Sequence, residues 1–264
     1  MRLSDMKYSL KLLYSGSDGN AALLTLGGQA VLIDAGRSAR TLTQSLCEAG
    51  VCPDDLLAVF LTHEHRDHTA ALDVFIKHHP IPVHVAGRSA EKLMQFGSDA
   101  LRAALIPHPP LFEITVGPFT FHSFVTPHDS EESVGYRITV TDEDGTHVIG
   151  YATDLGCVTS AVEEGLLGCE AVVLECNHDP DMLMTGPYPY VLKKRIASRN
   201  GHLSNPDCAA FSVRLAACGM KRLLLAHLSE TNNLPDLALG EVRSALAGLD
   251  VQVRAADPIH TTNL

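Results

Sequence analysis

The apolar positions of the chain fall into short runs that are separated by longer amphipathic segments. Runs rich in β-branched residues or leucine predict strands, and apolar residues at helical spacing predict helices. We expect strands over residues 8–13, 21–26, 30–33, 57–61, 83–86, 119–125, 136–141, 147–151, 171–174 and 223–225. We expect helices over residues 38–49, 69–78, 90–94, 159–166, 190–198, 206–217 and 237–247. This alternation predicts an α/β protein in which helices cover sheets.

The chain carries no Pro/Ser-rich linker and no low-complexity stretch. Its 264 residues, 45% of them apolar, are enough for one large core. We therefore expect a single domain over residues 1–264. Within it, Asp34 follows one strand-like run and precedes a helix, and Asp154 follows another in the same way. This repetition indicates two similar halves, although Asp before Gly after a strand is also an ordinary turn signal.

Two observations bear on the location of the protein. The longest apolar stretches, such as 171–174 and 223–226, are far shorter than the roughly 20 residues of a membrane-spanning helix, and the N-terminus lacks the pattern of a secretory signal. The seven cysteines form no C-x-x-C pair and suggest neither a disulfide framework nor a structural zinc site. We expect a cytoplasmic protein with reduced thiols and no membrane contact.

Charge and histidine content narrow the chemistry. A net charge of −11 would repel nucleic acid if it were evenly spread, so a polyanionic substrate must be held by a local basic patch or by metal ions. The 14 histidines are about twice the number expected from average composition. The positions of these histidines therefore decide whether the chain is suited to bind metal ions.

The densest group of potential metal ligands directly follows the expected strand 57–61. It comprises His63, His65, Asp67 and His68. A turn from a strand into a helix can gather closely spaced side chains around one point, and Zn²⁺, Mn²⁺ and Fe²⁺ accept imidazole and carboxylate ligands. The alternative is a polar loop with three unrelated histidines.

This H-x-H-x-D-H motif after a strand resembles the signature of metallo-β-lactamase fold hydrolases. The resemblance implies a four-layer αββα sandwich with metal ions at one edge. It also implies further ligands after later strands, which here are His128, Asp154 and His227. By this resemblance, two divalent ions (Zn, Mn or Fe) are bound per chain: one by His63, His65 and His128, the other by Asp67, His68 and His227, with Asp154 bridging them.

Asp34 resembles the early aspartate of that family. The resemblance implies that its carboxylate fixes a ligand imidazole from outside the metal site. The alternative is that Asp34 caps the helix near Ser38 or serves as a turn residue.

Five further segments resemble the YycJ/WalJ family of 5′-to-3′ DNA exonucleases. They are residues 15–20 (SGSDGN), 174–179 (LECNHD), 188–189 with 193–195, 201–205 (GHLSN), and 226–229 (AHLS) with 232–233. The resemblance implies a two-metal phosphodiester hydrolase that acts on DNA through a metal-activated hydroxide. The cleavage polarity rests wholly on this resemblance.

The candidate catalytic residues are Asp67, His202 and Glu175. Since a leaving 3′ oxygen needs a proton, His202 is the candidate general acid and Glu175 the residue that orients it, a contribution of about 10²- to 10⁴-fold. The alternative for His202 is a cap of the helix near Pro206. His178 is a further candidate for a group that supports a ligand or contacts substrate.

The candidate substrate-binding residues are Lys193, Lys194, Arg195, Ser17 and Asn20. The three cations precede the motif that contains His202 and are suited to hold phosphates, or else they form a solvated helix face. The loop with Ser17 and Asn20 contains glycines that expose N–H groups, so it is either a cradle for a terminal phosphate or a tight turn.

Two features of the sequence argue against particular kinds of nuclease. Only 110 residues follow Asp154, which leaves no room for the inserted domain of ribonuclease J-type nucleases. The sequence also shows no long projecting arm of the kind that tRNA-maturing enzymes use. A small-molecule phosphodiesterase on cyclic or nucleotide substrates remains the alternative. Amide, lactone or thioester hydrolysis and a regulatory protein without turnover also stay open, as do the metal, the preference for DNA or RNA and the oligomeric state.

Overall fold

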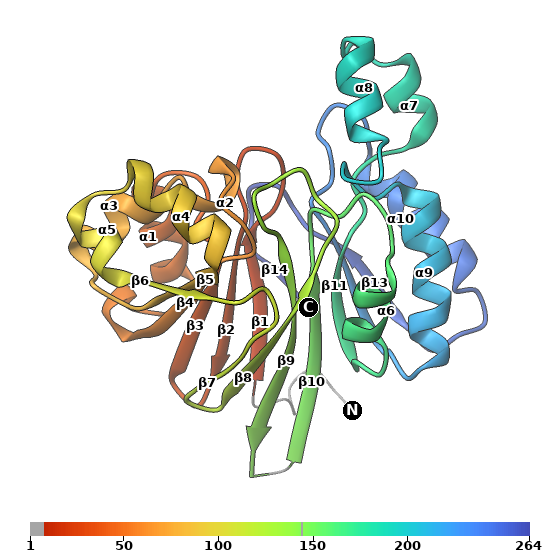
Figure 1. Ribbon diagram of the computed structural model, residues 1–264. Helices are drawn as coiled ribbons and strands as arrows, with labels where there is room; N and C mark the ends of the chain where they lie inside the picture. Colours follow the sequence, from red (N-terminus) through yellow and green to blue (C-terminus); the bar gives the residue numbers. More distant parts are fainter. Residues whose placement is uncertain (1–7, 144) are drawn as a thin grey trace.

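Two mixed β-sheets pack face to face and carry helices on both outer surfaces (Figure 1). The computed structural model describes residues 8–143 and 145–264, and in this part of the chain each sheet has seven strands. The four-layer αββα sandwich expected from the sequence is confirmed. No helix in the described residues is both long and apolar enough to span a bilayer.

The first sheet has an antiparallel half and a parallel half. Its strand order is β14 (Thr262–Asn263), β1 (Tyr8–Tyr14), β2 (Ala21–Leu26), β3 (Gln29–Ile33), β4 (Leu56–Phe60), β5 (Val83–Ala86) and β6 (Leu105–His108). Pairing is antiparallel from β14 to β3 and parallel from β3 to β6. The carboxyl ends of β3 and β4 therefore meet at one edge of the sheet.

The second sheet repeats this plan. Its order is β7 (Glu113–Val116), β8 (Phe119–Val125), β9 (Val134–Asp142), β10 (Gly145–Ala152), β11 (Ala171–Glu175), β12 (Arg222–Ala226) and β13 (Gln252–Ala255). Pairing is antiparallel from β7 to β10 and parallel from β10 to β13. Asp34 follows β3 and Asp154 follows β10, which are the corresponding strands of the two sheets. The repetition seen in the sequence thus reflects two halves of like topology.

Three apolar clusters hold the layers together. One lies between the sheets and includes the stacked rings of Phe60 and Phe121, whose centroids are 3.7 Å apart. A second covers the outer face of the first sheet with α1 (Ala39–Glu48), α3 (Leu72–His78), α4 (Gly87–Phe96) and α5 (Asp99–Ala104). The third covers the other sheet with α6 (Ser160–Leu166), α9 (Asn205–Ala217) and α10 (Pro235–Ala245). Burial of the outer faces leaves one edge of the sandwich free for the loops that carry the polar motifs.

Most expected elements are present, and the differences have local causes. The helix expected over 69–78 is split into α2 (Arg66–Thr69) and α3, so Asp67 and His68 lie inside the first turn of a helix rather than before it. The sequence analysis missed β6, β7, β13, β14, α5 and α7 (Pro180–Thr185), which have six residues or fewer and so give little periodic signal. A 3₁₀ turn over Pro53–Asp55 was not expected either.

A pair of short helices projects from the body of the molecule. Figure 1 shows α7 and α8 (Tyr190–Ile196) standing away from the sheets above α9 and α10. The helix expected over 190–198 is present as α8, whereas α7 was not expected. The two helices form a short arm, residues 180–196, beside the edge that carries the motifs; the sequence led us to expect no long arm, and this pair is a short one.

Candidate metal centre

The motif residues converge because they follow neighbouring parallel strands. Asp34 comes directly after β3 and His63 shortly after β4. In the second sheet Asp154, Glu175 and His227 lie at the ends of β10, β11 and β12. Since carboxyl ends of parallel strands share one edge, both sheets present these side chains to the same space.

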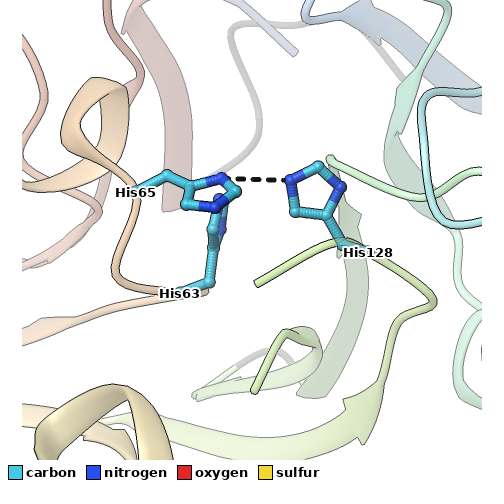
Figure 2. Close-up of side chains that lie close together, drawn as sticks. All are labelled: His63, His65 and His128. Atoms are coloured by element: carbon cyan, nitrogen blue, oxygen red, sulfur yellow. Dashed lines mark hydrogen bonds between the residues drawn. The ribbon is translucent and has the colours of Figure 1, made fainter. Parts of the chain in front are cut away.

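Three imidazoles form the first group that could hold a metal ion: His63, His65 and His128 (Figure 2). His65 Nδ1 and His128 Nε2 lie 3.2 Å apart, and the ring centroids of His63 and His128 are 4.9 Å apart. Figure 2 shows His128 facing the other two rings from a separate loop. Three nitrogens aimed at one point match the donor set of a divalent transition metal.

A second group lies next to the first and consists of Asp67, His68, Asp154 and His227. His68 Nε2 is 3.3 Å from Asp67 Oδ2 and 3.1 Å from Asp154 Oδ2. His227 Nε2 is 3.5 Å from Asp67 Oδ2 and 3.6 Å from Asp154 Oδ1. Two imidazoles and two carboxylates are again a donor set for a divalent ion.

The Asp154 carboxylate stands between the two groups. Its Oδ2 faces His68, and its Oδ1 lies 3.9 Å from His128 Nε2. A carboxylate can offer one oxygen to each of two cations, which an imidazole nitrogen cannot do. The position of Asp154 is therefore compatible with a bridging ligand.

Unpartnered polar atoms test whether metal ions fit this site. Within residues 8–143 and 145–264, His63 Nε2, His227 Nε2 and Asp154 Oδ2 are buried and have no hydrogen-bond partner. Buried polar atoms are normally paired, and each unpaired one is costly. All three point into the ligand groups, so the residues present fit two divalent ions.

The electrostatics of the site agree with this fit. Burial and the neighbouring charge of His68 hold the pKa of His63 well below its usual range, which keeps the imidazole neutral, as a metal ligand must be. Burial opposes protonation of His68, but the carboxylates of Asp154 and Asp34 raise its pKa well above the usual range. A protonated His68 thus offsets the buried carboxylates, and as a ligand it would have to release that proton while a divalent cation supplied the positive charge instead.

The backbone is strained where it turns into the site. Asp34, Asp154 and His227 have φ values of 61°, 57° and 54°. Residues other than glycine rarely adopt this left-handed conformation, and it concentrates at functional sites. At Gly36 the constraint is closer still, because an added Cβ would lie 2.0 Å from the carbonyl oxygen of Asp67. The strand ends are thus fitted to the ligand positions at a cost in conformational energy.

Asp34 supports a ligand from behind. Its Oδ2 lies 2.8 Å from His68 Nδ1, and its Oδ1 accepts a hydrogen bond from the Thr62 amide at 2.8 Å. The Asp34 carboxylate only accepts, so Nδ1 of His68 carries the hydrogen and Nε2 turns toward the ligand group. Ser38 itself caps α1, so the structure does not give Asp34 the alternative role of a helix cap.

Glu175 does the same for two histidines. Its Oε1 accepts from Nδ1 of His202 at 2.8 Å and from Nδ1 of His227 at 2.9 Å. Its Oε2 accepts from the amides of Leu155 and Leu203. Both oxygens are occupied by protein donors, so Glu175 orients the two imidazoles rather than serving as a metal ligand. Ser204, not His202, caps α9, so the alternative of His202 as the cap is not what the structure has.

The N-terminal loop braces the centre. Asn20 Nδ2 lies 3.2 Å from His68 Nε2 and 3.4 Å from Asp67 Oδ2, while its Oδ1 accepts from the Gly16 amide. Ser15 Oγ accepts from the His227 amide at 2.9 Å. The Asn20 side chain is thus occupied within the protein, whereas Ser17 is exposed and lines a cavity beside the centre.

The cavity that Ser17 lines has a volume of about 240 Å³ and lies between the metal centre and the arm. It is the smaller of two cavities beside the centre, and we call it the smaller cavity. His202, Arg195, Tyr188 and Ser17 line it, and Arg195 forms an ion pair with Asp129. The other cations expected to hold phosphates are placed differently. Lys193 donates to the carbonyl of Met184, and Lys194 lies over the Tyr190 ring. Arg195 is therefore the cation of the three that reaches the centre.

Several residues that support the centre were not identified from the sequence. Thr62 bonds Asp34, and Asn177 donates to the His227 carbonyl at 2.8 Å. His178, a sequence candidate, is buried and belongs to none of the ligand groups. The signal that could have found Thr62 and Asn177 is their position at strand ends next to ligands.

Comparison with known proteins agrees with the fold and the site. The model of the family described as the beta-lactamase superfamily domain matches residues 29–228. The fold and the site define a hydrolase of the metallo-β-lactamase class. The chain belongs to the beta-lactamase superfamily and, through similarity over nearly its full length, to the family of the YycJ and WalJ proteins within it.

Two relatives and one solved structure match nearly the whole chain. The chain is 30% identical over 264 residues to exodeoxyribonuclease YycJ of Bacillus anthracis, covering 98% of this chain and 96% of that protein. It is 29% identical over 265 residues to exodeoxyribonuclease WalJ of Streptococcus pneumoniae, covering 99% and 96%. The crystal structure of YhfI from Bacillus subtilis has a TM-score of 0.75 and 19% identity, covering 97% of this chain and 99% of that one, which shows the common fold.

We predict that Asp34→Ala lowers metal affinity about 10- to 100-fold, because His68 loses the group that orients it. Asp34→Asn, which keeps one acceptor oxygen, should lose less. The measurement is metal retained after dialysis against graded chelator, with thermal melting as a check on folding. Asp236→Ala, at an exposed carboxylate in the first turn of α10, is the matched control. Equal retention by Asp34→Ala and wild type would contradict the role of Asp34.

Proposed function

We propose that the protein is a two-metal 5′-to-3′ exonuclease that hydrolyses phosphodiester bonds of DNA. The observation that carries the proposal is the His202–Glu175 pair beside two adjacent ligand groups, since a metal centre with a separate proton donor suits a poor alkoxide leaving group. The names of the YycJ and WalJ relatives, both called exodeoxyribonucleases, support DNA as the substrate.

In this proposal His63, His65 and His128 would hold one divalent ion, Asp67, His68 and His227 would hold the other, and Asp154 would be a ligand shared by both. Such ions would lower the pKa of water and offset the charge that builds on the phosphodiester during displacement. The protein itself fixes the ligand imidazoles through Asp34 and Glu175. It thereby keeps the site ready for substrate.

His202 supplies the proton to the leaving 3′ oxygen. Its Nδ1 is held by Glu175, so its Nε2 is the atom available to substrate. Burial opposes protonation, but the Glu175 carboxylate raises the pKa of His202 above its usual value. The charged form needed by a general acid is thus favoured, and His202 lines the smaller cavity, where a leaving group has room.

The arm and the N-terminal loop hold the polymer. Arg195 offers charge for a phosphate beside the centre, and Ser17 lines the same cavity. Lys194, exposed on α8, offers charge for phosphates farther along the strand. Lys193 keeps α8 joined to α7 through its bond to Met184. His178 is buried, so in this proposal it supports the site rather than touching substrate.

The direct test is hydrolysis of duplex DNA that carries a 5′ phosphate and a 3′ label, with Mn²⁺-loaded protein. We expect progressive shortening from the 5′ end. The Asp67→Ala, His68→Ala double variant should leave the DNA intact, because both truncated side chains belong to one ligand group. Intact DNA with wild-type protein whose bound metal has been measured would sink the proposal and make small phosphodiesters the next substrates to test.

We predict that His202→Ala slows DNA hydrolysis about 10²- to 10⁴-fold, because the leaving oxygen departs without a proton. Hydrolysis of bis(p-nitrophenyl) phosphate should fall much less, since its leaving group is a stable anion. Single-turnover rates on both substrates, with metal content measured in parallel, make the comparison. His122→Ala, at a half-exposed histidine on β8, is the control. Equal losses on both substrates would show that His202 acts on the metals rather than on the leaving group.

We predict that Lys194→Ala with Arg195→Ala weakens DNA cleavage through KM and reduces the slope of log KM against log salt by about 1 for each phosphate that the variant no longer binds. Cleavage of bis(p-nitrophenyl) phosphate should fall much less and keep its weak dependence on salt, because this small substrate has no further phosphates for these cations to bind. Arg40→Ala with Lys221→Ala, two exposed cations on α1 and just before β12 that line neither cavity beside the centre, is the matched control. If the slope of log KM against log salt is unchanged in the variant, the arm does not bind the phosphates of DNA.

A further inference from the structure

A larger cavity opens on the side of the metal centre away from the arm. It has a volume of about 790 Å³ and lies against α2, α3, α4 and α5. His65 and Asp129 form the wall nearest the centre, and Asp129 lines the smaller cavity as well. The two cavities therefore meet at the metal centre. We call the larger one the α4 cavity.

Four carboxylates line the α4 cavity, and each one is engaged by a protein partner. Glu64 accepts from Ser89 Oγ at 2.6 Å and from the Glu131 amide at 2.9 Å, and Glu131 itself pairs with Arg88 at 3.3 Å. Asp73 pairs with Lys77, and Asp129 pairs with Arg195. Three of the four, Asp73, Asp129 and Glu131, thus face a cation, and Glu64 is held by neutral donors, so the acidic lining does not by itself exclude a polyanion.

Two other groups in the α4 cavity are free to bind. Phe96, on the last turn of α4, has 81% of its surface exposed. Arg66 has no ion-pair partner among residues 8–143 and 145–264, and it is exposed on the first turn of α2. An aromatic face and a cation are the two kinds of group that bind a base and a phosphate.

The chemistry of the proposed reaction decides which nucleotide would lie there. The oxygen of a water molecule bonds to the phosphorus and one of its protons is released to solvent, the bond from phosphorus to the 3′ oxygen breaks, and His202 gives its proton to that oxygen. The leaving 3′ oxygen belongs to the terminal nucleotide, so this nucleotide lies on the His202 side, in the smaller cavity. The nucleotide that keeps the phosphate must then leave the centre on the other side, past His65.

We infer that the α4 cavity binds the nucleotide that follows the scissile phosphate, with its base stacked on Phe96 and a phosphate of the retained strand held by Arg66. This inference rests on the proposed function and adds a binding site to it. The unequal volumes of the cavities agree with one nucleotide on the released side and a continuing strand on the other.

The test combines Phe96→Ala with a change in the substrate. One DNA strand carries an ordinary second nucleotide, and a matched strand is abasic at that position. We expect Phe96→Ala to lower kcat/KM for the first cleavage about 5- to 150-fold on the ordinary strand, because stacking on an aromatic side chain is worth about 1–3 kcal/mol per base. On the abasic strand, Phe96→Ala and wild type should be equal, since no base remains to stack.

Two variants and one small substrate make the result specific. Phe96→Trp should restore cleavage of the ordinary strand, and Leu237→Ala, which truncates an exposed apolar side chain on α10, should leave it unchanged. Hydrolysis of bis(p-nitrophenyl) phosphate and metal content should be the same in all variants.

Each other outcome overturns the inference in a recognisable way. If Phe96→Ala cleaves the ordinary strand at the wild-type rate, the base does not stack on Phe96, and the exonuclease proposal still stands. Equal losses on the ordinary strand, the abasic strand and the small phosphodiester would show a structural effect on the centre. Wild-type protein that leaves both strands intact would overturn the exonuclease proposal, and the α4 cavity inference with it.

Discussion

The candidate metal centre depends on buried carboxylates that accept hydrogen bonds from imidazoles. Glu175 is fully buried and takes donors from His202, His227 and two backbone amides. A single carboxylate thus fixes both a candidate metal ligand and a candidate proton donor, and it sets their separation. Burial alone would raise the pKa of Glu175, but the charge of His202 and its hydrogen bonds lower it to about 2. The group therefore stays ionised and keeps accepting.

Asp34 has the corresponding part in the other sheet. It is buried after β3, as Glu175 is buried at the end of β11, and it turns His68 toward the centre. Each half of the fold thus contributes a carboxylate that orients imidazoles and a set of side chains that face the shared space. The like topology of the sheets explains why the two halves can meet in this way, since equivalent strand ends lie at the same edge of the sandwich.

The fold and the candidate ligands could be predicted from the sequence because both have strong local sequence patterns. His63, His65, Asp67 and His68 lie within six residues after an apolar strand, and the remaining ligand candidates also follow strands. The α4 cavity had no such signal. Phe96 and Arg66 are 30 residues apart and come to line one cavity only through the packing of α3 and α4 against α5. The arm was missed for a related reason, because six-residue helices such as α7 have too few turns to show a period.

The distribution of the ligand candidates between the sheets has a thermodynamic consequence. His63, His65, Asp67 and His68 come from loops of the first sheet, whereas His128, Asp154 and His227 come from loops of the second. A cation held by such a set ties the two leaves of the sandwich together at their open edge. Because the cation binds only when the two sheets are packed as in the folded protein, its binding free energy adds to the stability of that packing. A newly synthesised chain would then acquire its hydrolytic activity and its full stability against unfolding in one step, when it binds the metal ions.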